Sequence, residues 1–120
     1  MPVISDEDER FIYFVRYVYG DALHLNQYSI LEPVKKNQRI KSETLDMVIT
    51  PFVAFDLHGH RLGTGGGYYD KTFSFLHDQA WTKPLMIGLG YAAQLAHELP
   101  TDPWDIKLNG VVTEKKFISF

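Results

Sequence analysis

The sequence has 120 residues, of which 45% are hydrophobic, and a formal net charge of −3. This length suffices for one compact core, and the charge offers no basic footprint for nucleic acid or an anionic membrane. The lack of cysteine excludes disulfides, thiolate metal sites and a thiol nucleophile, and no apolar run approaches the roughly 20 residues of a membrane span. We expect a single cytoplasmic α/β domain over residues 1–120, without nucleic-acid or membrane partners.

The first third of the chain predicts few regular elements. Residues 10–19 are rich in β-branched and aromatic side chains and predict a strand. The acids of residues 6–9 leave open a short helix there instead. Residues 21–28 are expected to form a loop or a short helical turn. Residues 35–44 are polar and are expected to form an exposed connection.

The rest of the chain alternates between strand and helix patterns. Residues 47–50 predict a buried strand, residues 68–79 a helix, and residues 85–89 a second strand. Residues 92–98 predict a short helix or turn, and residues 111–113 a short last strand. Such alternation is typical of an α/β fold, and we expect a three-layer sandwich with a mostly parallel sheet.

A glycine-rich loop follows the first of these strands, and its sequence is Arg61-Leu62-Gly63-Thr64-Gly65-Gly66-Gly67-Tyr68-Tyr69-Asp70. A strand, a glycine loop and a helix start form the arrangement in which backbone N–H groups converge on an anion, usually a phosphate. The loop lacks the Lys-Ser/Thr of a P-loop and the sixth-position glycine of a dinucleotide loop. From these residues alone a plain tight turn is an equal alternative. Arg61 at one end of the loop offers a fixed fork of hydrogen-bond donors for a phosphate. Asp70 at the other end could bind a divalent cation. Together they favour a metal-bound nucleoside triphosphate as the ligand.

Around this loop the sequence resembles the 5-formyltetrahydrofolate cyclo-ligase (methenyltetrahydrofolate synthetase) family. The most specific match is Arg61-Leu62-Gly-x-Gly-x-Gly-Tyr-Tyr-Asp within residues 46–70. Weaker matches occur in the expected order: Ile30-Leu31-Glu32-Pro33, Ile87-Gly88-Leu89-Gly90-Tyr91, Gln94, Leu99-Pro100, Asp105 and Val111-Val112-Thr113-Glu114. Together they cover about residues 2–114.

The resemblance implies an enzyme that uses ATP and Mg²⁺ to convert 5-formyltetrahydrofolate to 5,10-methenyltetrahydrofolate, with release of ADP and phosphate. It makes Arg61 and Tyr68 the catalytic residues. The implied ATP-binding residues are Arg61, Leu62, Gly63, Thr64, Gly65, Gly66, Gly67, Tyr68 and Tyr69. The implied contacts to the reduced folate are Thr64, Gly65, Gly66, Gly67 and Tyr68. Some relatives carry a lysine at the position of Gly66, so here Arg61 and backbone donors would carry more of the phosphate binding.

The resemblance also implies that Asp70 and Asp105 bind the magnesium ion. From the sequence alone, Asp70 is equally well a first-turn carboxylate favoured by the helix dipole, and Asp105 a loop aspartate. Asp56 is expected to cap a turn. His58 and His60 are expected to face solvent, and the five histidines show no metal-binding spacing. The two tryptophans are expected to be packing residues.

Family members are longer at the N-terminus, where a basic helix helps to hold ATP and a Glu-bearing segment contacts the folate. This sequence does not contain those segments. The expectation is therefore a sheet that is incomplete at the N-terminus, weak ATP binding and little turnover by the chain alone. The apolar surface left exposed favours self-association or a complementing N-terminal chain. The alternative function is a non-catalytic or split-enzyme fragment that retains the nucleotide loop.

Overall fold

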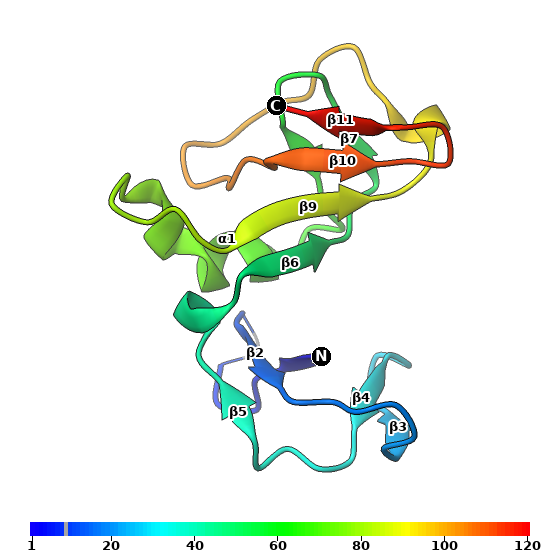
Figure 1. The fold of residues 1–120 in the computed structure, drawn as a ribbon, viewed down its shortest axis with the longest axis vertical. Helices are drawn as coiled ribbons and strands as arrows, with labels where there is room; N and C mark the ends of the chain where they lie inside the picture. The colour runs from blue at the N-terminus through cyan, green and yellow to red at the C-terminus, as the bar shows by residue number, and fades with distance from the viewer. Residues whose placement is uncertain (9) are drawn as a thin grey trace.

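The computed structural model describes residues 1–8 and 10–120. Short strands dominate this part of the chain (Figure 1), and none of its helices is long and apolar enough to cross a membrane. The strands are β1 Pro2–Ile4, β2 Ile12–Val15, β3 Leu23–Leu25, β4 Leu31–Pro33, β5 Arg39–Ile40, β6 Met47–Thr50, β7 Ala54–Phe55, β8 Arg61–Leu62, β9 Leu85–Leu89, β10 Gly110–Val112 and β11 Phe117–Ser119. The helices are α1 Tyr68–Thr72 and the 3₁₀ turns η1 Ser42–Thr44, η2 Ser74–His77 and η3 Ala92–Gln94.

A four-stranded sheet in the order β11-β10-β9-β6 forms the upper part of the molecule (Figure 1). Strands β6, β9 and β10 are parallel, as expected, and β11 runs antiparallel to β10. The strands predicted at residues 47–50 and 85–89 have these bounds, and the last lies one residue earlier than predicted. The expectation that residues 47–50 are buried is only half right: Val48 and Thr50 are buried, but Met47 and Ile49 are exposed because only one face of β6 is covered.

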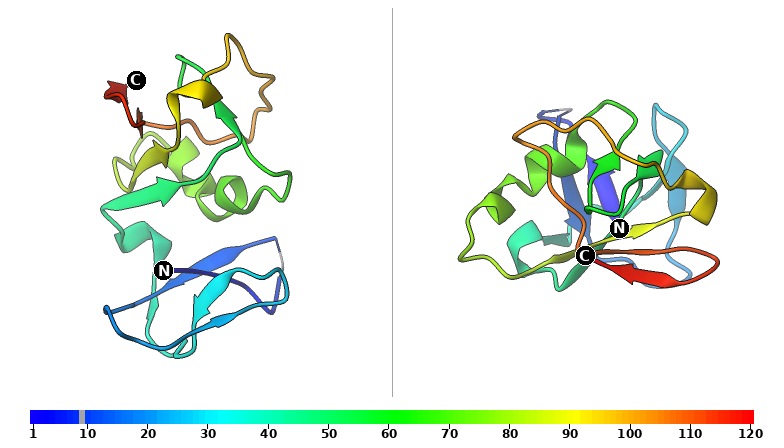
Figure 2. Two further views of the ribbon diagram at one scale, coloured as in Figure 1. Left: turned by 90° about the vertical axis from the view of Figure 1, so that its right-hand side faces the viewer. Right: turned by 90° about the horizontal axis from the view of Figure 1, so that it is seen from above.

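Helical turns cover one face of this sheet (Figure 2). The helix expected over residues 68–79 is shorter, since α1 ends at Thr72 and a 3₁₀ turn follows. Phe73 separates the two with φ −103° and ψ 19°, and its side chain is fully buried. Burial of this ring thus coincides with the change from α-helical to 3₁₀ geometry.

The lower part of the molecule is built from antiparallel pairs (Figure 1). One sheet has the order β1-β2-β5, so the strand predicted over residues 10–19 is confirmed only at its centre. Residues 6–8 are not helical, and Glu9 lies outside the described residues. The exposed connection expected over residues 35–44 contains the two residues of β5 and the turn η1.

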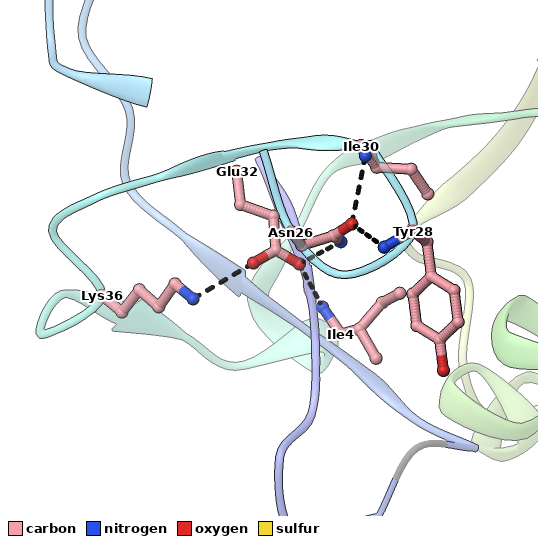
Figure 3. Close-up of polar contacts among 6 residues, drawn as sticks. All are labelled: Ile4, Asn26, Tyr28, Ile30, Glu32 and Lys36. Atoms are coloured by element: carbon pink, nitrogen blue, oxygen red, sulfur yellow. Dashed lines mark hydrogen bonds and ion pairs between the residues drawn. The ribbon is translucent and has the colours of Figure 1, made fainter. Parts of the chain in front are cut away.

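The loop expected over residues 21–28 is only partly right, because Leu23–Leu25 form β3, which pairs with β4 to make a hairpin. The Asn26 Oδ1 atom accepts the backbone N–H groups of Tyr28 and Ile30 at 2.8 and 3.1 Å (Figure 3). This side chain closes the hairpin turn together with two backbone hydrogen bonds, from the Asn26 N–H to the Ile30 carbonyl at 2.9 Å and from the Ser29 N–H to the Asn26 carbonyl at 3.0 Å. Propensity alone does not reveal such a short pair of strands.

Glu32 of β4 ties this hairpin to the rest of the lower part. The residue is only 3% exposed, and its Oε1 atom accepts the N–H of Ile4 at 3.1 Å and the amide of Asn26 at 2.9 Å. Lys36 donates to Oε2 at 3.1 Å, as Figure 3 shows. Burial by itself raises the pKa of Glu32, but these three donors outweigh it and the pKa lies below the ordinary value. The carboxylate is therefore ionised and fully engaged.

One apolar core joins the two parts. Ile12 and Phe14 of β2 belong to the same buried cluster as Val48, Phe55 and Phe73 of the upper part. The Phe14 and Phe73 ring centroids are 5.8 Å apart, and the N–H of Ile12 donates to the Thr72 hydroxyl at 3.1 Å. The molecule is thus an α/β fold with mixed sheets and few helices.

Candidate active-site cleft

The hairpin of β7 and β8 carries Arg61 and is fixed by the buried carboxylate of Asp56. Asp56 Oδ1 accepts the backbone N–H groups of His58 and His60 at 2.9 and 3.0 Å, which places the aspartate at a turn cap as predicted. Its Oδ2 atom contacts the His60 Nδ1 atom at 2.9 Å and accepts the N–H of Leu99 at 3.3 Å. The expectation that His60 faces solvent is therefore wrong, because the buried aspartate binds its ring.

The electrostatics of Asp56 follow from these partners. Burial by itself raises the pKa of the carboxyl, but the contact with His60 and the backbone donors outweigh it, so the pKa lies below its usual value. The ionised carboxylate holds the turn closed. Because β8 begins at Arg61, this turn sets the position of the arginine.

The glycine loop leads from β8 into α1 with a backbone that needs glycine. Gly65 and Gly67 have φ values of +108° and +67°, which L side chains rarely adopt. A Cβ atom at Gly66 would lie 2.3 Å from the Tyr68 ring. A larger side chain at this position would therefore require the Tyr68 ring to move.

A cleft of about 280 Å³ brings the sequence-predicted site residues together. Its lining includes the whole stretch from Arg61 to Asp70, together with Asp105 from the distant segment before β10. All the residues proposed for ATP, folate and magnesium therefore face one cavity. The remaining lining residues are Pro51, Phe52, Asp102 and Trp104.

Arg61 has an unusual environment in the wall of this cleft. Its side chain is 7% exposed, its Nη2 atom donates to Asp70 Oδ1 at 3.1 Å, and its guanidinium lies 5.6 Å from the centre of the Tyr69 ring. Burial raises the pKa of Tyr69, and the nearby Arg61 charge partly offsets that effect. The buried Nε–H of Arg61 has no hydrogen-bond partner among the described residues. An unsatisfied charged donor of this kind is costly unless a ligand or water completes it.

The two candidate metal ligands are linked through the backbone. Asp70 Oδ1 accepts the N–H of Ile106, the residue after Asp105, at 3.0 Å. Asp105 Oδ2 accepts the N–H of Asp102 at 2.9 Å. The part of the chain that the structure describes holds no group of three or more His, Asp or Glu side chains able to bind a metal. A cation at this place would need water or phosphate oxygens as its further ligands.

The sequence reasoning missed Phe52, Asp102 and Trp104 as parts of this cleft. Phe52 follows the carboxyl end of β6, and ligands of α/β sheets bind at such ends, so this signal was available. Gln94 holds the segment by donating to the carbonyls of Phe52 and Val53 at 3.2 and 3.1 Å. Trp104 was expected to pack, but it is 63% exposed. Trp81 does pack, edge-on against Phe75, with ring centroids 5.0 Å apart.

Comparison with known proteins shows the family of this chain. Residues 1–114 match the model of the 5-formyltetrahydrofolate cyclo-ligase family. The chain belongs to this family. It is 36% identical to a 5-formyltetrahydrofolate cyclo-ligase of Haemophilus influenzae over 109 residues, and 37% identical to that of Escherichia coli K12 over 119 residues. These matches cover 90% and 97% of this chain, respectively.

The fold agrees with that of a solved cyclo-ligase relative. The NMR structure of Aquifex aeolicus 5,10-methenyltetrahydrofolate synthetase superposes with a TM-score of 0.77 and 35% identity, over 98% of this chain and 56% of that protein. The chain likewise spans 57% of the Haemophilus relative and 63% of the Escherichia relative. More than a third of each of these proteins thus lies outside the match.

Proposed function

We propose that this chain carries the nucleotide and folate site of a 5-formyltetrahydrofolate cyclo-ligase, which converts 5-formyltetrahydrofolate and ATP into 5,10-methenyltetrahydrofolate, ADP and phosphate. One observation carries the proposal. The buried Arg61 guanidinium, with an unpartnered Nε–H, lines the same cleft as the glycine loop and both aspartates. The family match includes the whole loop, which favours this reaction over a non-catalytic fragment.

Arg61 and the loop would hold the triphosphate. A guanidinium presents a rigid fork of donors that suits phosphate oxygens, and the side chain's hydrogen bond to Asp70 fixes its direction. The loop from Gly63 to Gly67 offers backbone N–H groups without side chains beyond that of Thr64. Catalysis of phosphoryl transfer consists largely of such positioning and charge neutralisation.

The reaction needs no covalent intermediate on the protein. The formyl oxygen of the folate takes the terminal phosphoryl group of ATP, and ADP leaves. The folate N10 nitrogen then attacks the activated formyl carbon and loses its proton, and the C–O bond breaks. Phosphate departs with the former formyl oxygen, which leaves the methenyl bridge. Arg61 would stabilise the charge that moves between the phosphate groups.

Magnesium fits the donor set of the cleft. This ion takes one or two carboxylates and completes its octahedron with water and phosphate oxygens. Asp70 and Asp105 supply two carboxylates on the same cavity. Bound there with ATP, the ion would neutralise phosphate charge.

Tyr68 would sit beside the folate. Its ring lies over Gly66 in the described conformation, and an aromatic face next to the loop suits stacking on a flat pterin ring. Thr64 and Gly65–Gly67 would contact the same ligand from the backbone side. Tyr69 is more deeply placed, because it stacks on Phe73 in the core with ring centroids 6.3 Å apart.

The test is calorimetric titration of the chain with MgATP, alongside an absorbance assay for methenyltetrahydrofolate. Arg61→Ala should weaken MgATP binding by about tenfold to a hundredfold, since a charge-assisted phosphate contact is worth roughly 1.5–3 kcal/mol. Arg39→Ala is the control, because Arg39 lies over the Tyr13 ring far from the loop in sequence and outside the cleft lining. Equal affinities of wild type and Arg61→Ala would overturn the proposal.

A further inference from the structure

One aromatic ring of the cleft has no part in the function proposed above. Trp104 lines the cleft and is 63% exposed. A single exposed apolar side chain is ordinary on an open surface, but ligand cavities are typically lined by aromatic side chains that the ligand then covers. An indole in the wall of the cavity that also holds the glycine loop is therefore suited to a flat ligand group.

A second aromatic residue of the cleft, Phe52, is already engaged by the protein itself. A Cβ atom at Gly88 of β9, or at Gly90 after it, would be 2.6 or 2.5 Å from the Phe52 ring. The Phe52 ring centroid is also 5.2 Å from that of the buried Phe55. Phe52 thus packs against the sheet rather than standing free in the cleft.

The two tyrosines of the cleft lining also have other contacts. The Tyr69 ring stacks on the buried Phe73 ring, with an angle of 15° between their planes. The Tyr68 ring lies over Gly66 and is assigned above to the folate. Among the described residues that line the cleft, Trp104 is therefore the aromatic side chain that remains for a second flat ligand group.

The backbone on both sides of Trp104 is held in place. The N–H of Asp105 donates to the Asp102 carbonyl at 3.1 Å, and Asp105 Oδ2 accepts the N–H of Asp102 at 2.9 Å, which closes a tight turn. His77 Nε2 donates to the Trp104 carbonyl at 3.1 Å. Ile106, the residue after the turn, is buried in the core. The turn therefore presents the indole in a fixed place, and a preorganised contact of this kind loses little entropy when a ligand binds.

The position of this turn points to the nucleotide. Trp104 directly precedes Asp105, which the proposed function makes a ligand of magnesium. An ion held there would bring the triphosphate beside the turn, and the base is joined to the triphosphate through one ribose. The carboxylates of Asp102 and Asp105 line the same cavity and repel phosphate from the ring between them. The uncharged base is the part of the nucleotide that suits this place.

We propose that Trp104 is the stacking platform for the purine base of the nucleotide, an inference that rests on the proposed function. Aromatic side chains bind bases by stacking, because every base has a flat π-face. The two rings of a purine cover more of an indole than the single ring of a pyrimidine does. Trp104 would thus add affinity for the base to the affinity for phosphate that Arg61 and the loop supply.

The experiment uses Trp104 as its own fluorescent reporter. The chain has two tryptophans, and Trp81 packs against Phe75 outside the cleft lining, so Trp81→Phe leaves Trp104 as the single indole. That chain is titrated with MgATP, with MgCTP and with magnesium tripolyphosphate, which has no base. Calorimetry compares the affinities of wild type, Trp104→Ala and Trp104→Phe, with Trp81→Phe as the control. Thermal unfolding verifies that each variant is folded.

The expected result separates the base from the phosphates. MgATP should quench the fluorescence of Trp104, whereas tripolyphosphate should bind with little quenching. Trp104→Ala should weaken MgATP binding by about fivefold to a hundredfold and leave tripolyphosphate binding unchanged. Trp104→Phe should retain most of the MgATP affinity, Trp81→Phe all of it, and MgCTP should bind the wild type less tightly than MgATP.

Equal losses of MgATP and tripolyphosphate affinity in Trp104→Ala would overturn the proposal, because they would show that Trp104 only positions Asp105. Unchanged fluorescence on MgATP binding would overturn it too, as would a loss of folate affinity alone. If tripolyphosphate binds as tightly as MgATP, this inference fails and the proposed function stands. If neither ligand binds, the proposed function fails and this inference fails with it.

Discussion

Two buried carboxylates, one in each part of the molecule, perform similar structural tasks with different partners. Asp56 is fully buried and holds the hairpin that carries Arg61. Glu32 is almost fully buried and holds the β3–β4 hairpin against β1. The donors to Asp56 include two backbone N–H groups within four residues, whereas those to Glu32 come from Ile4, Asn26 and Lys36.

This difference shows which polar networks a sequence reveals. The turn at Asp56 follows from local chemistry, since an aspartate readily accepts N–H groups two and four residues ahead. The network at Glu32 requires β1 to lie beside the hairpin, which no local pattern indicates. Burial raises the pKa of each carboxyl group, but its hydrogen-bond donors have the larger, opposite effect, so both pKa values lie below the ordinary ones. The two carboxylates are thus comparable in charge state and differ in how far along the chain their partners lie.

The largest effect should come from Asp56→Ala. It leaves three backbone N–H donors without their acceptor, and at ~1–3 kcal/mol for each unsatisfied buried group the free energy of unfolding should fall by about 3 kcal/mol or more. MgATP binding should weaken with it, because the hairpin positions Arg61. Urea unfolding measures the first effect and calorimetry the second. Asp78→Ala, which removes the acceptor for Ala80 in an exposed turn, should change neither, and equal losses in both variants would contradict this account.

Glu32→Gln should have the next largest effect, and a local one. The substitution keeps the shape but removes charge-assisted hydrogen bonds, so the free energy of unfolding at pH 7 should fall by about 1.5–3 kcal/mol. Hydrogen exchange should quicken at the amides of β3 and β4 and stay unchanged in β9. Faster exchange throughout β9 at equal stability would show that the network supports the whole molecule rather than its lower part.

The free energy of unfolding should depend on pH through these two carboxylates. Both have folded-state pKa values below the ordinary ones. Their contributions are therefore complete above the unfolded values of about 4 and are lost as the pH falls through the folded values. Urea midpoints measured from pH 6 to pH 3 should decline in the wild type and decline less steeply in Glu32→Gln. Identical slopes would mean that the pKa of Glu32 does not differ between the folded and the unfolded chain.

The smallest effects should come from the two lysine ion pairs. Lys36 forms an ion pair with the buried Glu32, and the Lys36 side chain is 31% exposed. Lys83 and Asp46 form a pair at 2.9 Å in which both side chains are exposed. Lys36→Met should lower the free energy of unfolding by about 1 kcal/mol. Lys83→Met should leave the melting temperature unchanged, as is usual for surface pairs. A larger loss from Lys83→Met than from Lys36→Met would reverse the ranking of buried and exposed charges.

The candidate site was largely predictable because it lies in one stretch of chain. The residues from Arg61 to Asp70 carry a motif whose spacing reflects backbone geometry, and two of its glycines have the positive φ values that the turn requires. Asp105 came only from the family resemblance, since a lone loop aspartate has no local signature. Phe52 and Trp104 line the cleft because of tertiary packing. For Phe52, its position just after β6 could have indicated this.

The sequence by itself determined the family, the glycine loop and the strands β6 and β9, because contiguous apolar runs and turn residues encode local geometry. Only the tertiary structure decided that Phe73 ends α1, that residues 23–33 form a hairpin, and that the Nε–H of Arg61 is buried without a partner. It also decided which face of β6 is covered. Alternation marks two faces of a strand, but which of them meets the core depends on elements far away in the chain.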